Sequence, residues 1–316
     1  MMSALQNSMR TVFAHRRILN SFWPRLVTKT SCCSEAKMAG EGTVKVEQLE
    51  GVTLIGINRP EKRNCVNTPT AEALLKAFQE FDADESSKVA VLYGVGGNFC
   101  AGYDLKEVAE DVPVSLGSYG RGPMGPSRFE TRKPVIAAVE GFAVAGGLEL
   151  ALWCDLRIVE ETAVMGVYCR RFGVPLIDGG TVRLPAIVGV GRALDLILTG
   201  RAIKAKEALE WGIANRLVAC GTAIGQAVKM AQELLKFPQE CMLADRASVY
   251  NAVFNAKSLQ EALQFEHENG CPVIFKVSGE KSCRNSSMII ERAIEKGGGG
   301  GWGRHEAVPG RAAPDT

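Results

Sequence analysis

The segment at residues 135–155 constrains the fold of the chain more than any other part of the sequence. It opens with five apolar residues at 135–139, passes through a turn of small residues and reaches the pair Gly146-Gly147. The pattern after this pair predicts a helix over residues 146–154. A short apolar run bounded by a turn is typical of a strand buried on both faces, and a helix directly after it is typical of a parallel sheet. The segment therefore predicts an α/β fold.

The rest of the central region also shows patterns that predict strands and helices. Alternating residues at 44–48 and an apolar run at 52–57 predict two strands joined by a turn at residues 50–51. Thr68-Pro69 is a favourable helix start. Further strands are expected at residues 89–93 and 156–159, and helices at residues 68–81, 181–188, 193–199, 205–211 and from about 223 into the 260s.

Composition argues against several classes of protein. The chain has 316 residues, of which 46% are hydrophobic and 23% charged, and its formal net charge is +2. This length suffices for one large domain or two modest ones. A nearly neutral charge gives no reason to expect a nucleic-acid or membrane surface. No apolar run is long enough to span a bilayer. Neither nucleic acid nor membrane is therefore an expected partner.

The ten cysteines are scattered, with no CxxC pair and no Cys/His cluster of zinc-binding spacing. We interpret them as reduced thiols in an intracellular compartment. Only three histidines are present, His15, His267 and His305, and they give little support to a His-based triad or a His-rich metal site. No metal is expected.

The first 37 residues differ from the rest of the chain. Six Lys and Arg residues lie there among Ser, Leu, Phe and Trp, and no acid precedes Glu35. This composition is typical of a mitochondrial transit peptide. We therefore expect residues 1–37 to be removed or disordered in the mature protein, and the protein to lie in the mitochondrial matrix. The alternative is an untranslocated, disordered tail on a cytoplasmic protein, with Met38 as an alternative start.

Two further segments lack a regular pattern. The loop at residues 111–131 is rich in Gly, Pro and Ser, and a loop of this length inside a compact domain is usually a lid or a mobile segment. The stretch from residue 297 opens with five consecutive glycines, and we expect it to be disordered.

Two segments are candidates for carrying chemistry. In the first, Ala101 and Gly102 follow a predicted strand and allow the backbone to approach a ligand closely, although a plain tight connection would use the same residues. In the second, the predicted helix begins at Gly146, and the first amides of a helix form a ready oxyanion site. Glu149 lies in the first turn of this helix. It is either a favourable helix-dipole residue or, in its apolar surroundings, an acid or base with a perturbed pKa.

Three stretches of the sequence resemble the crotonase superfamily, which is the enoyl-CoA hydratase/isomerase family: NFCAGYDLKEV, PVIAAVEGFAVAGGLELALWCDLRI and GGTVRLPAIVGVGRALDLILTGRAIKAKEALEWGIANRLV. The resemblance covers residues 43–265. It implies a crotonase-type spiral of repeated strand–strand–helix units with a helical C-terminal part, and it leaves residues 266–316 unplaced. It also implies assembly as a homotrimer or a dimer of trimers.

The resemblance implies a role for each matching residue. The backbone amides of Tyr103 and Gly146 would form an oxyanion hole for the thioester carbonyl of an acyl-CoA. Tyr103, Asp104, Leu105, Lys106 and Gly146 would contact the substrate and its coenzyme A. No separate cofactor is implied, because coenzyme A enters as part of the substrate.

The catalytic acids match the family only in part. Glu149 matches the first of two glutamates with which family hydratases activate water, but the second position is Cys169, and a thiol without a nearby base is a poor substitute. Asp178 falls near an acid of the dienoyl-CoA isomerase branch, or it is a helix N-cap. Arg170 and Arg171 would hold an acidic substrate group or lie at a subunit contact. Lys62 and Arg63 are candidate phosphate contacts.

The resulting prediction is an acyl-CoA enzyme of the hydratase/isomerase type, a lyase or an isomerase, with Glu149 and Asp178 as catalytic residues. Two alternatives stay open because of Cys169. One is another crotonase-type reaction, such as decarboxylation or hydrolysis of an acyl-CoA. The other is a catalytically weak acyl-CoA-binding relative.

Overall fold

The computed structural model describes residues 42–109 and 122–279. The predictions for residues 1–37, for the first part of the loop at 111–131 and for the stretch from residue 297 lie outside these ranges. The strands are β1 (Val44–Leu49), β2 (Val52–Ile57), β3 (Val89–Gly94), β4 (Val135–Val139), β5 (Phe142–Val144), β6 (Leu156–Glu160), β7 (Val164–Gly166), β8 (Ala202–Lys204) and β9 (Arg216–Val218). The α-helices are α1 (Thr68–Ala83), α2 (Leu105–Ala109), α3 (Gly146–Trp153), α4 (Gly180–Val188), α5 (Val190–Thr199), α6 (Ala205–Glu210), α7 (Ala223–Leu234), α8 (Gln239–Phe254) and α9 (Leu259–Gly279).

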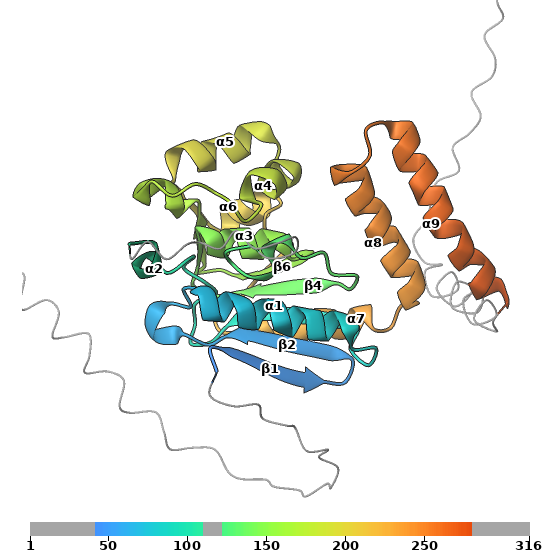
Figure 1. Ribbon diagram of the computed structural model, residues 1–316, viewed down its shortest axis with the longest axis horizontal. Helices are drawn as coiled ribbons and strands as arrows, with labels where there is room; N and C mark the ends of the chain where they lie inside the picture. The colour runs from blue at the N-terminus through green and yellow to red at the C-terminus, as the bar shows by residue number, and fades with distance from the viewer. Residues whose placement is uncertain (1–41, 110–121, 280–316) are drawn as a thin grey trace, which may run out of the picture. The chain divides into compact units, whose positions relative to one another are not determined.

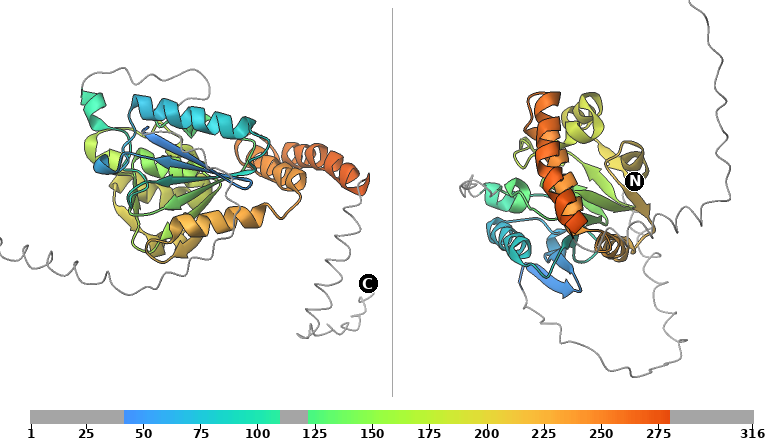
Figure 2. Two further views of the ribbon diagram at one scale, coloured as in Figure 1. Left: turned by 90° about the horizontal axis from the view of Figure 1, so that it is seen from below. Right: turned by 90° about the vertical axis from the view of Figure 1, so that its right-hand side faces the viewer.

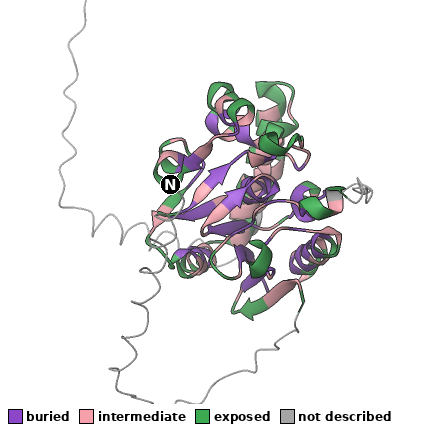
Figure 3. Ribbon diagram, turned by 90° about the vertical axis from the view of Figure 1, so that its left-hand side faces the viewer, coloured by how far each residue is buried: buried purple, intermediate pink, exposed green. Residues whose placement is uncertain are grey.

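The main sheet confirms the predicted α/β class. Its strand order is β1-β2-β3-β4-β6-β9, and every neighbouring pair except β1 and β2 is parallel. The turn at residues 50–51 joins β1 to β2, with Leu49 opposite Val52, as the sequence pattern predicted. The central strands are buried on both faces because helices cover both sides of the sheet (Figures 1 and 3).

Alternation along the strands divides the apolar side chains between two clusters. On one face, Val52, Leu54 and Val91 pack with residues of α7, such as Ala227 and Met230. On the other face, the side chains pack with α1 and α3, in a larger cluster that also reaches α4 and α5. The helix that begins at Gly146 therefore lies on the face opposite α7, with its first residues close to the ends of the parallel strands.

A smaller sheet connects the two candidate segments. Its order is β5-β7-β8, with β5 parallel to β7 and β7 antiparallel to β8. An isolated parallel bridge also joins Ala143 of β5 to Cys100, which lies in the first candidate segment. The sequence patterns did not reveal these three-residue strands, yet they bring the segment at 100–104 beside the start of α3.

The predicted helical tail consists of three helices, α7, α8 and α9. The last two lie side by side (Figures 1 and 2). Helix α8 has no buried residue, but it is tied to the core through Asp155, whose Oδ1 accepts hydrogen bonds from Arg246 Nε and Tyr250 Oη, both at 2.8 Å. Residues 266–279, which the sequence left unplaced, lie in α9. Among the described helices, none is both long and apolar enough to cross a membrane.

Candidate active site

The first part of the site is formed by backbone around Tyr103. Val66 N donates to Gly102 O, and Asp104 N donates to Val66 O, both at 2.8 Å. Because successive amides of an extended segment point to opposite sides, the amide of Tyr103 points away from Val66. Gly102 has φ +99, and a Cβ built on it would lie only 3.2 Å from Gly146 N. The segment of Tyr103 and the start of α3 are therefore in direct contact.

The turn into α3 has an unusual conformation. Ala145, the residue before the helix, has φ 53 and ψ −127, a strained region for a residue with a side chain, and its amide donates to Gly166 O at 2.9 Å. Such a conformation costs on the order of 1–3 kcal/mol. It turns the chain sharply into α3, so that the amide of Gly146 lies at the positive end of the helix and lacks an acceptor within it. The turn thus creates a site suited to a developing negative charge.

Glu149 is buried in the first turn of α3, with only 3% of its surface exposed. Its Oε1 accepts hydrogen bonds from Asp178 N at 3.0 Å and from Gly180 N at 2.8 Å. A Cβ built on Gly180 would lie 2.9 Å from this oxygen, so that no larger residue fits there without a shift. Burial, and then the charge of Asp178, raises the pKa of Glu149 to about 7, although the two amides act in the opposite direction. The carboxyl can therefore take up or release a proton near neutral pH.

Asp178 is equally buried and lies directly before α4. Its Oδ1 accepts a hydrogen bond from Met124 N at 3.0 Å and another, very short one, from Ser127 Oγ. The N-cap of α4 is Gly179, and no side chain caps that helix, so the interpretation of Asp178 as an N-cap is wrong. Burial raises its pKa, and the hydrogen bonds from Ser127 and Met124 oppose that rise. The structure thus brings both predicted acids together.

Met124 and Ser127 escaped the sequence analysis. They lie in the second part of the loop at 111–131, whose length and composition were the only signal. Met124 is fully buried, and its Sδ would lie 2.7 Å from a Cβ built on Gly146. This loop therefore touches both the turn into α3 and the carboxyl of Asp178.

Cys169 is the residue that the sequence resemblance matches to the second glutamate of family hydratases. It is 7% exposed and lies in the short 3-10 helix Tyr168–Phe172. Burial, and then the charge of Glu149, raises the pKa of its thiol, which stays neutral near pH 7. The neighbouring Arg170 Nε and Arg171 Nε donate to the carbonyls of Ile197 and Gly200. Neither of the two roles suggested for these arginines is tested by these contacts.

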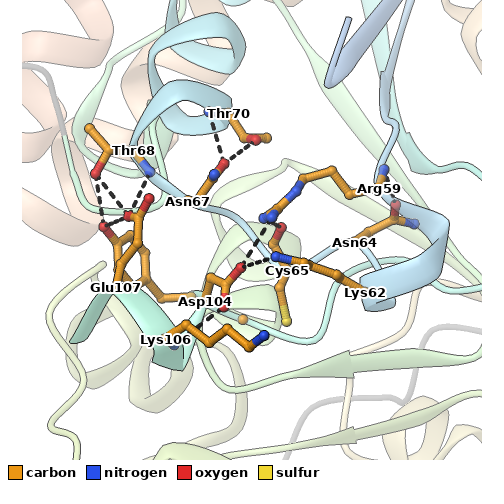
Figure 4. Close-up of polar contacts among 12 residues, drawn as sticks. Arg59, Lys62, Asn64, Cys65, Asn67, Thr68, Thr70, Asp104, Lys106 and Glu107 are labelled. Atoms are coloured by element: carbon orange, nitrogen blue, oxygen red, sulfur yellow. Dashed lines mark hydrogen bonds and ion pairs between the residues drawn. The ribbon is translucent and has the colours of Figure 1, made fainter. Parts of the chain in front are cut away.

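Asp104 organises a charged cluster with Arg59 and Lys62 (Figure 4). Its Oδ2 accepts hydrogen bonds from Arg59 Nη2 and Lys62 Nζ, both at 3.1 Å, and its Oδ1 accepts one from Lys106 N at 3.3 Å. Burial alone would raise the pKa of Asp104, but the bonds from Lys62 and Arg59 outweigh it and lower the pKa. Asp104 therefore holds Lys62 beside the first segment. Leu105, the next residue, is exposed at the start of α2.

A second cluster fixes the side chain of Tyr103. Oε2 of Glu107 accepts hydrogen bonds from Tyr103 Oη at 2.7 Å and from Thr68 N and Thr68 Oγ1, both at 3.0 Å (Figure 4). Burial would raise the pKa of Glu107, but the bond from Tyr103 and those from Thr68 lower it. This cluster ties the end of the first segment to the start of α1.

Other kinds of site find little support in residues 42–109 and 122–279. No group of three or more His, Cys, Asp or Glu side chains there could hold a metal ion. The seven cysteines in these ranges are free thiols.

Comparison with known proteins identifies the family of the chain. The model of the enoyl-CoA hydratase/isomerase family matches residues 47–284. Enoyl-CoA hydratase EchA19 of Mycobacterium tuberculosis is 35% identical over 196 residues, which cover 60% of this chain and 73% of that protein. The human enoyl-CoA hydratase domain-containing protein 2, mitochondrial, is 37% identical over 232 residues, which cover 69% of this chain and 79% of that protein.

A solved structure is similar over most of the described chain. The crystal structure of an enoyl-CoA hydratase from Mycobacterium tuberculosis superposes with a TM-score of 0.73 and 33% identity, and covers 80% of this chain and 97% of that one. The match confirms the crotonase fold. The chain belongs to the enoyl-CoA hydratase/isomerase family of the crotonase superfamily.

Proposed function

We propose that the chain moves a proton along the acyl group of an unsaturated acyl-CoA and so shifts the position of a double bond. The observation that carries this proposal is the pair of buried carboxyls, Glu149 and Asp178, both with raised pKa values, beside the turn into α3. In an isomerisation of this kind, one carboxyl can remove a proton and the other can return one.

The backbone part of the site would stabilise the intermediate. Loss of a proton next to a thioester carbonyl places negative charge on the carbonyl oxygen. The amides of Tyr103 and Gly146 belong to backbone segments in contact, and Gly146 lies at the positive end of α3. Two donors aligned before the reaction stabilise such an oxyanion at little reorganisation cost.

The two acids would divide the proton transfer. Two carboxyls that share a buried site rarely ionise together, because each negative charge raises the pKa of the other. The ionised one removes a proton from one carbon, and the neutral one gives its proton to another carbon of the acyl chain. Glu149, in α3, would act next to the carbonyl, and Asp178 would act farther along. After one turnover the two carboxyls have exchanged protonation states, and return of a proton from Glu149 to Asp178, directly or through solvent, restores the starting state.

Hydration is the second candidate, and the names of the relatives favour it, since EchA19 and many others are called enoyl-CoA hydratases. Against it stands the neutral thiol of Cys169 where a second carboxylate would activate water. Decarboxylation and hydrolysis of the thioester need the oxyanion hole without both acids. A relative that only binds acyl-CoA would need neither the oxyanion hole nor the two acids.

A panel of 2-enoyl-CoA and 3-enoyl-CoA thioesters incubated in D₂O would separate these reactions by mass spectrometry. We expect deuterium at carbon with no added oxygen and a shifted double bond. Addition of water to the product would instead support hydration. Release of free acid would support hydrolysis, loss of CO₂ from a carboxyacyl-CoA would support decarboxylation, and binding without turnover would support the weak relative.

Coenzyme A would be bound as part of the substrate. The ammonium of Lys62 is held by Asp104, and the exposed Lys106 follows two residues later in the chain, so that both suit the phosphates of coenzyme A (Figure 4). Calorimetry with an acyl-CoA and with the matching free acid would test this proposal. Equal affinities would contradict it. No separate cofactor is proposed.

Assembly into trimers, or dimers of trimers, would cover apolar surface that the single chain leaves exposed. Val249, Val253 and Phe254 of α8 and Leu263 of α9 are exposed, and a cavity of about 1120 Å³ separates these helices from the core. The two acids do not line this cavity, so we assign it to a second copy rather than to substrate. Light scattering of the purified protein would show a trimer or hexamer, whereas a monomer would contradict the assignment.

Mitochondrial targeting is supported by the composition of residues 1–37 and by the name of the human relative. Fractionation of the source cells and sequencing of the mature N-terminus would test it. An intact Met1 in the cytosolic fraction would contradict it.

A further inference from the structure

We propose that Ser127 is a positioning residue that, with the amide of Met124, determines which oxygen of Asp178 exchanges a proton with the substrate. This inference rests on the proposed acid–base role of Asp178. Nothing in the family match or in the sequence pattern points to Ser127. It is assigned by its contacts alone.

Both donors end on the same oxygen. Ser127 Oγ and Met124 N donate to Oδ1 of Asp178, and in the described part of the chain no hydrogen bond is directed at Oδ2. Among the described residues, Oδ2 of Asp178 is not one of the buried side-chain oxygens that lack a hydrogen-bond partner. Two hydrogen bonds to Oδ1 concentrate negative charge on that oxygen, so that the proton resides on Oδ2.

In Glu149, too, one carboxyl oxygen accepts both hydrogen bonds. Its Oε1 accepts from the amides of Asp178 and Gly180, which leaves Oε2 for the proton. Each acid therefore has one oxygen held by two donors and one oxygen available for exchange. The difference is that both donors to Glu149 are backbone amides, whereas one donor to Asp178 is a side chain. Ser127 is thus the donor of this set that can be removed by substitution.

The position of Ser127 is well defined. Its side chain is 1% exposed, and its carbonyl accepts from Arg183 Nη2 at 2.8 Å, while Arg183 Nη1 donates to Asp178 O at 3.0 Å. One guanidinium thus connects the backbones that carry the two side chains. The turn before Ser127 is closed by reciprocal bonds between Gly122 and Gly125 at 2.9 and 3.0 Å. This rigidity is what a positioning role requires.

The charges around Asp178 determine the direction of the expected effect. Glu149 faces it from α3, Arg183 from α4, Arg128 from the loop of Ser127, and the thiol of Cys100 from the first segment. The hydroxyl of Ser127 stabilises the ionised carboxylate against burial. Its removal should keep Asp178 protonated to higher pH.

The test is the pH dependence of kcat for the Ser127→Ala variant, with acyl-CoA substrate. We expect the limb that belongs to the Asp178–Glu149 pair to move up by about one pH unit, because a hydrogen bond to a carboxylate stabilises its charge to about that extent. The limb of the pH profile should move to higher pH whether Asp178 acts as an acid or as a base. Ser87→Ala is the matched control, since Ser87 is also 1% exposed and bonds a side chain, Thr53 Oγ1. It should leave the profile unchanged.

Two further comparisons make the result decisive. Ser127→Ala added to Asp178→Asn should cause no further loss of kcat, because Ser127 acts through Asp178. If the alanine variant fails to fold, Ser127→Thr and Ser127→Val replace it. These two have the same shape and differ in the hydroxyl, and only the valine should move the limb.

The outcomes separate the two proposals. If Asp178→Asn keeps full activity, the acid–base role of Asp178 fails, and this inference fails with it. If Asp178→Asn is inactive but Ser127→Ala keeps the wild-type pH profile, only the positioning role is wrong.

Discussion

The two halves of the candidate active site are built in different ways. The oxyanion half consists of backbone, namely the segment of Tyr103 and the turn into α3, which meet where Gly102 lies against Gly146. The acid half depends on side chains from three separated segments: Glu149 in α3, Asp178 directly before α4, and Ser127 in the loop that also supplies the amide of Met124. A backbone site needs only small residues at the right turns, whereas a side-chain site needs particular groups to meet through the tertiary fold.

The two halves of the site should therefore respond differently to amino-acid substitution. In the oxyanion half, the donors cannot be removed by substitution and can only be displaced by an added side chain. In the acid half, single atoms can be exchanged with little change of shape. Substitutions in the two halves should therefore differ both in the size of the effect and in what else they disturb.

The largest effect is expected in the acid half, at Glu149. Glu149→Gln keeps the shape and can still accept from Asp178 N and Gly180 N, but it cannot transfer a proton. We expect kcat to fall by roughly 10²–10⁴-fold, with binding of acyl-CoA retained, as measured by steady-state kinetics and calorimetry. The exposed Glu61 offers a control, Glu61→Gln, which should leave both unchanged. Near wild-type turnover in Glu149→Gln would remove Glu149 from the mechanism.

The corresponding change in the oxyanion half is Gly102→Ala. An added Cβ would lie 3.0 Å from Ala145 Cβ and 3.2 Å from Gly146 N, and would push the two donor segments apart. Since the loss of one oxyanion donor costs about 10²–10³-fold in kcat, we expect a loss of about 10²-fold. Gly97→Ala is the control for backbone strain, because Gly97 also has positive φ, +82, but no atom lies within 4 Å of the added Cβ. Equal losses in both variants would mean that strain, and not donor placement, is responsible.

A third prediction concerns stability and again separates the halves. Because the pKa of Glu149 is raised from its ordinary value near 4.5 to about 7, the folded chain binds more protons than the unfolded chain between these pH values. Stability should therefore fall as pH rises through this window, on the order of 3 kcal/mol in total. Glu149→Gln should lack this loss. Urea unfolding at pH 5 and pH 8 would measure the free energy of unfolding of both proteins. If the difference in this free energy between wild type and Glu149→Gln were the same at both pH values, the prediction would be contradicted.

The same contrast explains what could be predicted from the sequence. The parallel strands and α3 follow from apolar runs and from glycines close to them in the chain, whereas the pairing of Tyr103 with Gly146 is implied only by the family resemblance. The partners of Asp178 could not be predicted, because Met124 and Ser127 lie more than fifty residues away in a loop without periodicity. Asp178 before two glycines has a local pattern typical of an N-cap, and tertiary contacts with that loop override it.

A smaller effect is expected from Tyr103→Phe. The ring is kept, but the hydrogen bonds from its hydroxyl to Glu107 Oε2 at 2.7 Å and with Thr68 Oγ1 at 3.0 Å are lost. Each such bond contributes about 1 kcal/mol, so we expect kcat to fall by about 10-fold or less, as the backbone of Tyr103 becomes less well held. Tyr93→Phe, a change in a buried tyrosine on the α7 face of β3, is the control and should leave kcat unchanged. A loss as large as that of Gly102→Ala would assign the hydroxyl a direct role in the reaction.

The smallest effect is expected at Cys169, although the sequence resemblance matches it to a catalytic acid of family hydratases. Its thiol is neutral near pH 7, because burial and the charge of Glu149 both raise its pKa, and a neutral thiol is a poor base. Cys169→Ala should therefore change kcat by no more than about 3-fold and cost about 1 kcal/mol of stability through lost packing. Cys154→Ala, in another buried cysteine, directly after α3, controls for the packing loss. If Cys169→Ala lost activity as fully as Glu149→Gln while Cys154→Ala did not, the thiol itself would be the second reacting group, and the proton partner of Glu149 would have to be sought there rather than at Asp178.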